Sequence, residues 1–205
     1  EPPITIYVQG ENAWRFEHEW PLARTKWTPF YLRGNAVLSQ EPAAESEAPA
    51  SFTSVPRLMG DQEPPHIFYA TAPLVADMEV TGPVALYLHG SLSTDDGNWM
   101  AEIHDVAPDG SKKVVLGGWL KASHRELDSV RSKPYKPFHP HTRNVPVAPG
   151  EVNEYAIEMS ETSYLFKAGH RLQLLIKGQD AHNYHLPNNS DIRHTVYHGG
   201  PYPSH

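Results

Sequence analysis

The segment 80–128 constrains the fold more than any other, because apolar and polar side chains alternate in it over successive runs. Apolar residues hold every second position in two of these runs, at Val84, Leu86 and Leu88 and again at Trp99, Ala101 and Ile103. A period of two is typical of a β-strand with one buried face. Turn residues separate the runs, as Thr-Asp-Asp-Gly at 94–97 and Pro-Asp-Gly at 108–110, so we expect three strands. The third run, 113–121, contains Gly117 and Gly118, which predict a bulge or a close backbone approach.

The rest of the chain predicts more short strands and at most one turn of helix, near 124–128. Its 205 residues include 20 prolines and 14 glycines, a composition that suits short strands joined by loops. Segments 40–50, 133–150 and 178–192 are predicted to be loops. The further strands are expected at 4–9, 28–32, 37–38, 66–70, 75–80, 155–159, 172–176 and 194–198. The fold class that follows is all-β, a single jelly-roll β-sandwich over residues 1–205.

The composition excludes several kinds of site and partner. The chain has no cysteine, which excludes a cysteine nucleophile and a thiolate metal site and leaves the cellular compartment undefined. Its net charge is −7 without a cluster of lysine or arginine, so we expect no nucleic-acid partner. No apolar run approaches the roughly 20 residues that span a bilayer, so we expect no membrane partner.

Two serines lie near residue types that could activate them. Ser91 follows His89 and Gly90, but no glycine stands two positions later. The run also reads as a strand, whereas a nucleophile elbow is a strand-to-helix turn. Ser123 precedes His124 and Asp128, but neighbouring side chains on an extended chain point to opposite faces. We therefore expect neither serine to be a nucleophile.

Thirteen histidines raise the question of a metal site. His139 and His141 form a His-x-His pair like that of cupins, but no carboxylate follows before Glu151. His194 and His198 would lie about 13 Å apart on one strand face. The remaining pair is His182 and His185. We expect solvated or hydrogen-bonded histidines, and we assign no catalytic, cofactor-binding or metal-ligating residue and no cofactor to this chain.

Loop aspartates and tryptophans leave two further alternatives. Asp95, Asp96, Asp105 and Asp109 could bind calcium, which prefers oxygen ligands from loops. Aspartate also forms turns, and that is the interpretation we favour. Tryptophans such as Trp99 could stack on a sugar, although most serve as core or interface anchors. A carbohydrate-binding module therefore stands as the alternative function, since the same architecture hosts many sugar binders.

Ten short motifs occur in a specific order along nearly the whole chain. They are IYVQGENAWR at 6–15, TPFYL at 28–32, APL at 72–74, EVTGP at 79–83, STDD at 93–96, DVAPDG at 105–110, GWLKASHR at 118–125, FKAGHRL at 166–172, TVYH at 195–198 and PSH at 203–205. With these motifs the chain resembles the C-terminal, galactose-binding-like jelly-roll domain of the X-Pro dipeptidyl-peptidase and cocaine-esterase group of serine hydrolases.

The resemblance implies a catalytic α/β-hydrolase domain upstream, with its serine, aspartate and histidine outside this chain. It implies that residues 1–205 form a non-catalytic accessory domain. Such a domain packs on the protein's own hydrolase domain, helps to form the wall of the substrate pocket and contributes to homo-oligomer contacts. The loops 133–150 and 178–192 are the expected docking segments. The resemblance also implies an apolar strand after the motif at 203–205, where the printed sequence ends.

Overall fold

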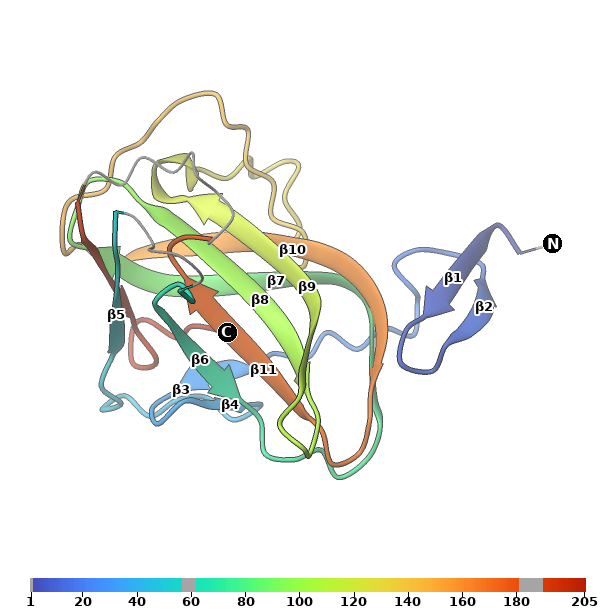
Figure 1. The fold of residues 1–205 in the computed structure, drawn as a ribbon. Coiled ribbons are helices and arrows are strands. Elements are labelled where there is room, and N and C mark those ends of the chain that lie inside the picture. Colours follow the sequence, from blue (N-terminus) through green and yellow to red (C-terminus); the bar gives the residue numbers. More distant parts are fainter. Residues whose placement is uncertain (1, 57–61, 181–189) are drawn as a thin grey trace.

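The computed structural model describes residues 2–56, 62–180 and 190–205 and is built almost entirely of β-strands (Figure 1). His182 and His185 lie outside the described residues. No helix in the described part of the chain is long and apolar enough to cross a bilayer. In chain order the elements are β1 (Ile4–Val8), β2 (Ala13–Glu17), β3 (Tyr31–Arg33), β4 (Val37–Ser39), β5 (Ala50–Ser54), β6 (His66–Ala70), β7 (Met78–Leu92), β8 (Asn98–Val106), β9 (Lys112–Lys121), the 3₁₀ turn η1 (Ala122–His124), β10 (Asn153–Phe166), β11 (Arg171–Lys177) and β12 (Ile192–Val196).

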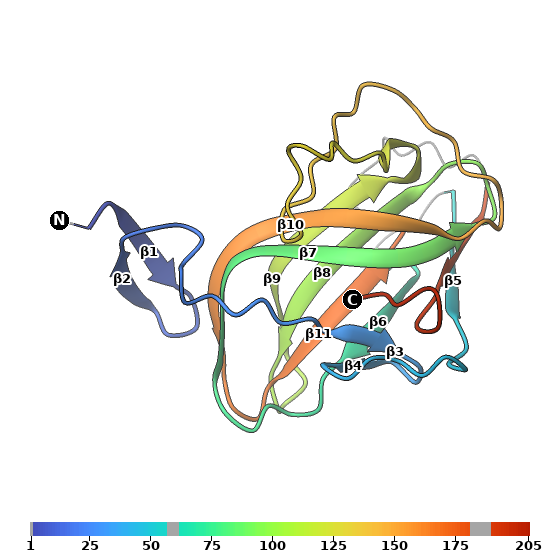
Figure 2. The same ribbon diagram turned by 180° about the vertical axis from the view of Figure 1, so that it is seen from behind.

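One curled sheet forms the body of the molecule. Its strand order is β3-β4-β6-β11-β8-β9-β10-β7-β12-β5. Because the sheet curls, β7 and β10 pass across the face of β8, β9 and β11 (Figures 1 and 2). Apolar side chains from both layers fill the space between them, including Leu88, Trp99, Tyr155 and Ile157, each 0% exposed. The predicted all-β jelly-roll sandwich is confirmed.

The three strands predicted from the alternating segment all form. Leu86 and Leu88 of β7 and Trp99 and Ala101 of β8 point into the core, as a strand period of two requires. The bulge in β9 lies at Val115, where the register shifts between the pairs Ile103–Leu116 and His104–Val114.

The glycine pair of β9 marks a close backbone approach. A Cβ on Gly118 would lie inside van der Waals contact of the carbonyl oxygen of Glu158 on β10 and 2.9 Å from Cα of Met159. At Gly117 the nearest atom would be the carbonyl oxygen of Ala101, at 3.2 Å. Gly118 is therefore the position where β9 and β10 come too close for a side chain.

Two strands, β2 and β5, were not predicted. In β2 the exposed positions are aromatic, at Trp14 and Phe16, whereas Glu17 is buried. This is the reverse of the usual polarity, so the alternation does not reveal the strand. The strand predicted at 75–80 begins only at Met78, and Val75 before it is fully exposed.

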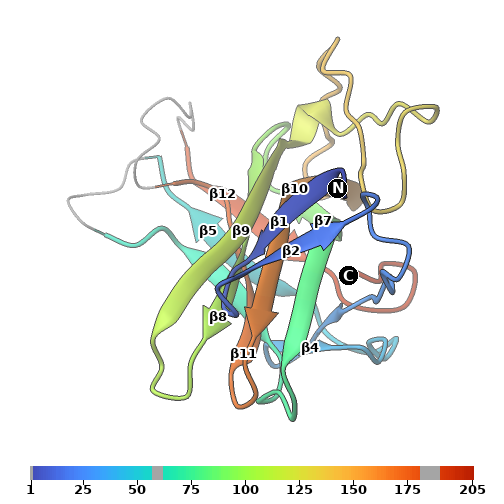
Figure 3. The ribbon, with the colours of Figure 1, turned by 90° about the vertical axis from the view of Figure 1, so that its right-hand side faces the viewer.

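The strands β1 and β2 form a separate hairpin outside the bend of β7 and β10 (Figures 1 and 3). Two backbone hydrogen bonds attach its turn to β10, from Gln9 N to Ser163 O and from Leu165 N to Gln9 O. A bidentate ion pair of 2.8 and 2.6 Å joins Arg15 of β2 to Glu79 of β7. From the hairpin the chain runs across the body to β3 (Figure 2).

Candidate functional site

The serine candidates named from sequence do not meet a base. Ser91 lies on β7, buried, with its Oγ 3.4 Å from the hydroxyl of Tyr197. The Oγ of Ser123 donates to Oδ2 of Asp96 at 2.8 Å. Asp128 accepts the backbone amides of residues 130 and 131, both at 3.0 Å. The residues Ser123, His124 and Asp128 thus have three different sets of partners and form no triad.

A serine–histidine contact does occur elsewhere, between Ser54 of β5 and His194 of β12. The Oγ of Ser54 lies 2.9 Å from Nε2 of His194. Both residues are 0% exposed, and Nδ1 of His194 has no hydrogen-bond partner to orient the ring. Burial lowers the pKa of His194 to about 3. No substrate reaches this pair, so it belongs to the core, and its 140-residue separation left no pattern in the sequence.

The aspartate candidates act in turns and in buried networks. Asp96 accepts from the amides of Gly97 and Ser123, and Lys121 pairs with it at 3.0 Å. Burial opposes its ionisation, yet the bonds from Lys121 and Ser123 prevail and lower its pKa. Asp109 accepts from the amide of residue 111, and Asp105 accepts from the hydroxyl of Tyr164 at 2.8 Å. In the described ranges no three histidine, cysteine or acidic residues gather as metal ligands.

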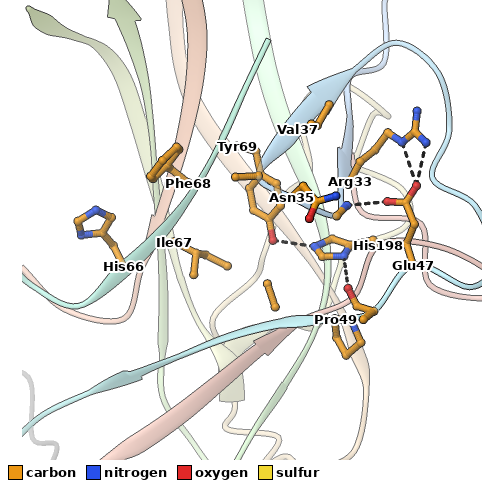
Figure 4. A pocket seen from close by; sticks show the side chains of 14 residues that line it. Arg33, Asn35, Val37, Glu47, Pro49, His66, Ile67, Phe68, Tyr69 and His198 are labelled. Carbon is orange, nitrogen blue, oxygen red and sulfur yellow. Dashed lines mark hydrogen bonds and ion pairs between the residues drawn. The ribbon is translucent and has the colours of Figure 1, made fainter. Parts of the chain in front are cut away.

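A cavity of about 870 Å³ lies beside the β3–β4 turn and β6 (Figure 4). The hydroxyl of Tyr69 lies 2.8 Å from Nε2 of His198, and Nδ1 of His198 lies 2.7 Å from Ala48 O. Because a carbonyl oxygen only accepts, Nδ1 carries the proton and Nε2 accepts from Tyr69. Both ring nitrogens are used within the protein, so His198 offers neither to a ligand.

Glu47 lies beside His198 in the wall of the cavity (Figure 4). Its carboxylate accepts the amides of Gly34 at 2.6 Å and Ala44 at 3.1 Å, and two bonds from Arg33 at 3.1 and 2.8 Å. The Gly34 bond is the main cause that lowers the pKa of Glu47 to about 2. The carboxylate of Glu47 and both ring nitrogens of His198 are therefore satisfied within the protein, and the bonds of Glu47 join Ala44 to the β3–β4 turn.

A second hollow, of about 990 Å³, is largely apolar and follows β7. Its walls include Val80, Val84 and Leu86 of β7, Phe30 before β3, and the terminal residue His205. Trp27 and Tyr135, which also line it, stack with ring centroids 4.2 Å apart. The predicted docking loop 133–150 therefore folds back over this hollow at Tyr135.

In the part of the chain that the structure describes, the hairpin brings three exposed aromatic side chains to one face. Thr5, Tyr7, Trp14 and Phe16 share one face, because Thr5 pairs with Phe16 and Tyr7 with Trp14. The exposed fractions of Tyr7, Trp14 and Phe16 are 40%, 67% and 64%. We call these four residues the hairpin face. Trp99, the proposed sugar platform, is 0% exposed and is a core residue.

Comparison with known proteins gives one family and several relatives. The family model described as the X-Pro dipeptidyl-peptidase C-terminal non-catalytic domain matches residues 1–205. A putative serine esterase of Mycobacterium bovis is 28% identical over 212 residues, covering 90% of this chain and 33% of that protein. The cocaine esterase of Rhodococcus sp. is 28% identical over 219 residues, covering 92% and 36%. The chain thus spans about a third of the length of the curated relatives it matches.

Two solved structures share the fold. A CocE/NonD family hydrolase from Staphylococcus aureus superposes with a TM-score of 0.86 at 24% identity, over 100% of this chain and 40% of that one. An alpha-amino acid ester hydrolase superposes with a TM-score of 0.82 at 20% identity, over 99% and 40%. At these identities the likeness establishes the architecture.

Proposed function

This chain belongs to the family of X-Pro dipeptidyl-peptidase C-terminal non-catalytic domains, and we propose that it is the accessory domain of a serine hydrolase of the dipeptidyl-peptidase or acyl-esterase type. Residues 1–205 form one domain in this proposal. The observation that carries it is the family match over the whole chain, together with relatives about three times as long. Catalysis by serine, histidine and aspartate then belongs to the remaining two thirds of the protein.

The accessory domain packs on that catalytic domain through the hairpin face. Contiguous exposed aromatic side chains mark protein-interaction sites, and tyrosine and tryptophan are typical interface anchors. The hairpin is also the first element of the chain, and the proposed catalytic domain lies upstream of it in the sequence. The ion pair between Arg15 and Glu79 holds the opposite side of the hairpin to the body and fixes the direction of the hairpin face.

The role of this contact is to help shape the substrate pocket of the catalytic domain or the contacts of a homo-oligomer. The loops 133–150 and 178–192, predicted as docking segments from sequence, are further candidates. Loop 133–150 lies against the apolar hollow beside β7 through Tyr135. Loop 178–192 lies largely outside the described residues.

The test of the non-catalytic role uses the chain by itself. We expect purified 1–205 to hydrolyse no p-nitrophenyl ester and to react with no fluorophosphonate probe, whereas the full-length protein does both. The serines that could react are Ser54, Ser91 and Ser123, and all three are buried. Covalent labelling of any of them in folded protein would refute the proposal, and labelling lost in a Ser→Ala variant would identify the residue.

A further inference from the structure

Two histidines that the fold does not use in its core face each other near the end of β9. His124 ends η1, and His141 lies in the long loop that follows. Their Nδ1 atoms are 2.9 Å apart, and their ring centroids are 5.1 Å apart. Two bare nitrogen lone pairs at this distance would repel each other, so something positive must lie between them. That is either one proton or a metal ion.

The contact of the second ring nitrogen of His124 defines which tautomer the neutral ring adopts. Its Nε2 lies 2.6 Å from Oδ1 of Asn144. An amide oxygen only accepts, so Nε2 carries the proton, and in the neutral ring Nδ1 carries a free lone pair. That lone pair points at His141. A metal-ligating histidine typically donates its other N–H to a carbonyl or carboxylate oxygen in this way.

His141 is held in place by an uncommon backbone conformation. Its φ is +51°, in the left-handed region that few residues other than glycine adopt and that often occurs at functional sites. The side chain is exposed, and a neutral imidazole ring carries one nitrogen lone pair that can bind a cation.

His139 stands beside the pair but is not available as a ligand. Its ring centroid lies 5.8 Å from that of His141. Its Nδ1 lies 3.0 Å from the carbonyl oxygen of Glu126, and its Nε2 lies 2.7 Å from that of Ala156. Both nitrogens lie against backbone carbonyl oxygens, so this ring is part of the scaffold and offers neither nitrogen to an ion. The His-x-His pair read from sequence thus separates into one structural histidine and one exposed one.

We propose that His124 and His141 form a two-histidine binding site for a divalent transition-metal ion such as Zn²⁺, with water in the remaining positions. Bonds of about 2.0–2.1 Å in a tetrahedral site place the two nitrogens about 3.3 Å apart. The rings need to separate by only a few tenths of an ångström, and His141 is exposed. When the ion enters, the proton on Nδ1 of His141 moves to Nε2 on the same ring, so no proton is lost.

The ligand set also defines which ions bind. Imidazole nitrogens suit Zn²⁺, Cu²⁺ and Ni²⁺, whereas Mg²⁺ and Ca²⁺ prefer oxygen ligands. With two protein ligands the site is weaker than the three- and four-ligand sites of zinc proteins.

The test is calorimetric titration of the chain 1–205 with ZnCl₂ near neutral pH. We expect one equivalent to bind, and MgCl₂ to produce no binding heat. His124→Ala and His141→Ala should each weaken the affinity by about tenfold or more. His18→Ala, which removes an exposed histidine on the hairpin side of the chain, should leave the affinity unchanged. Circular dichroism confirms that each variant is folded.

Substitutions of Asn144 distinguish a site in which His124 is oriented for metal ligation from an adventitious contact between an ion and a histidine. Asn144→Ala removes the acceptor for Nε2 of His124 and should weaken Zn²⁺ binding, since losing such an orienting partner costs about tenfold to a hundredfold. Asn144→Asp should tighten it, because a carboxylate makes the imidazole more basic. The proposal is overturned if no saturable binding occurs up to about 1 mM ZnCl₂, or if one equivalent binds to both histidine variants with the affinity of the wild type.

Discussion

Tyr87 and His205 exchange both of their backbone hydrogen bonds, Tyr87 N to His205 O at 2.8 Å and His205 N to Tyr87 O at 3.0 Å. This is the hydrogen-bonded pair of an antiparallel ladder. The next residue back, Ser204, accepts from Leu32 N of β3 at 2.9 Å. Ser204 and His205 therefore lie between β3 and β7, where His205 lines the apolar hollow. One side of β7 pairs with β10. On the other side, among the described residues, no strand pairs with the part of β7 that precedes Tyr87.

The first prediction concerns that open edge. A segment of about six residues added after His205, with apolar residues alternating so that they enter the hollow, should pair with β7 and raise the free energy of unfolding. Each apolar side chain that becomes buried contributes about 1.5–3 kcal/mol, and each backbone hydrogen bond to β7 contributes about 0.5–1.5 kcal/mol, whereas ordering each residue of the backbone costs about 1–2 kcal/mol. We expect a net gain in urea unfolding. A glycine–serine extension of the same length is the control, and equal stability of the two proteins would contradict the prediction.

The second prediction concerns the hairpin face. In the chain 1–205, the double substitution Trp14→Ser and Phe16→Ser should change the free energy of unfolding by less than about 1 kcal/mol, because both side chains are largely exposed. In the full-length protein the same change should lower the thermal midpoint of the catalytic domain and its esterase activity, since the interface loses its anchors. Differential scanning calorimetry and p-nitrophenyl ester hydrolysis measure the two effects.

Trp119 provides the control for the hairpin face. It lies on β9 and is 76% exposed, so Trp119→Ser removes an equally accessible tryptophan from a different strand. We expect full-length Trp119→Ser to keep its activity and midpoint. An equal loss in both proteins would show that the hairpin face has no special role in docking.

The third prediction compares two adjacent glycines. Gly118→Ala places a Cβ against the backbone of Glu158 and Met159, and backbone atoms cannot move aside without separating β9 from β10. Overpacking of this kind costs about 1–3 kcal/mol. Gly117→Ala meets its nearest atom at 3.2 Å and should cost less. Urea unfolding of both variants checks the order, and similar losses would mean that β10 yields easily at this point.

The alternating strands could be predicted from sequence because burial on one face leaves a local pattern. This holds for β7 and β8, where Leu86, Leu88, Trp99 and Ala101 are buried at alternate positions, whereas β10 and β11 contain continuous runs of buried residues. It fails for β2, because Trp14 and Phe16 face outward, whereas the charged residues Arg15 and Glu17 are less exposed. A strand with exposed aromatic residues and a buried glutamate has the opposite polarity from the one that the alternation rule expects.

The contacts between distant segments could not be predicted. His124 and His141 are 17 residues apart and meet only because a long proline-rich loop turns back on η1. Ser54 and His194 meet across 140 residues through the pairing of β5 with β12. Neither contact produces a periodic pattern in the local sequence. Residue types alone therefore suggested several sites, and only the topology of the fold shows which side chains are in contact.

The last prediction concerns the acid sensitivity that His194 gives to the fold. The unfolded chain protonates this histidine near its ordinary pKa of 6.5, whereas burial holds the folded pKa at about 3. Between these values the unfolded state binds more protons, so stability is fully present above pH 6.5 and falls as the pH drops towards 3. The shifted carboxylates, such as Glu47 with an ordinary pKa of 4.5, act only at lower pH. Between pH 7 and about pH 5, His194 should therefore remove about 2 kcal/mol of stability.

His194→Gln keeps a polar partner for Ser54 without a titrating ring. We expect this variant to be less stable than wild type at pH 7, because the glutamine cannot reproduce the stacking of His194 on Phe52 and its edge contact with Trp99. Its loss between pH 7 and about pH 5 should nevertheless be smaller by about 2 kcal/mol in urea unfolding. His18→Ala, at an exposed histidine, should retain the full wild-type loss. If the His194→Gln protein lost as much stability as wild type over this range, the acid sensitivity would have to come from His89 and His198, whose pKa values burial also lowers.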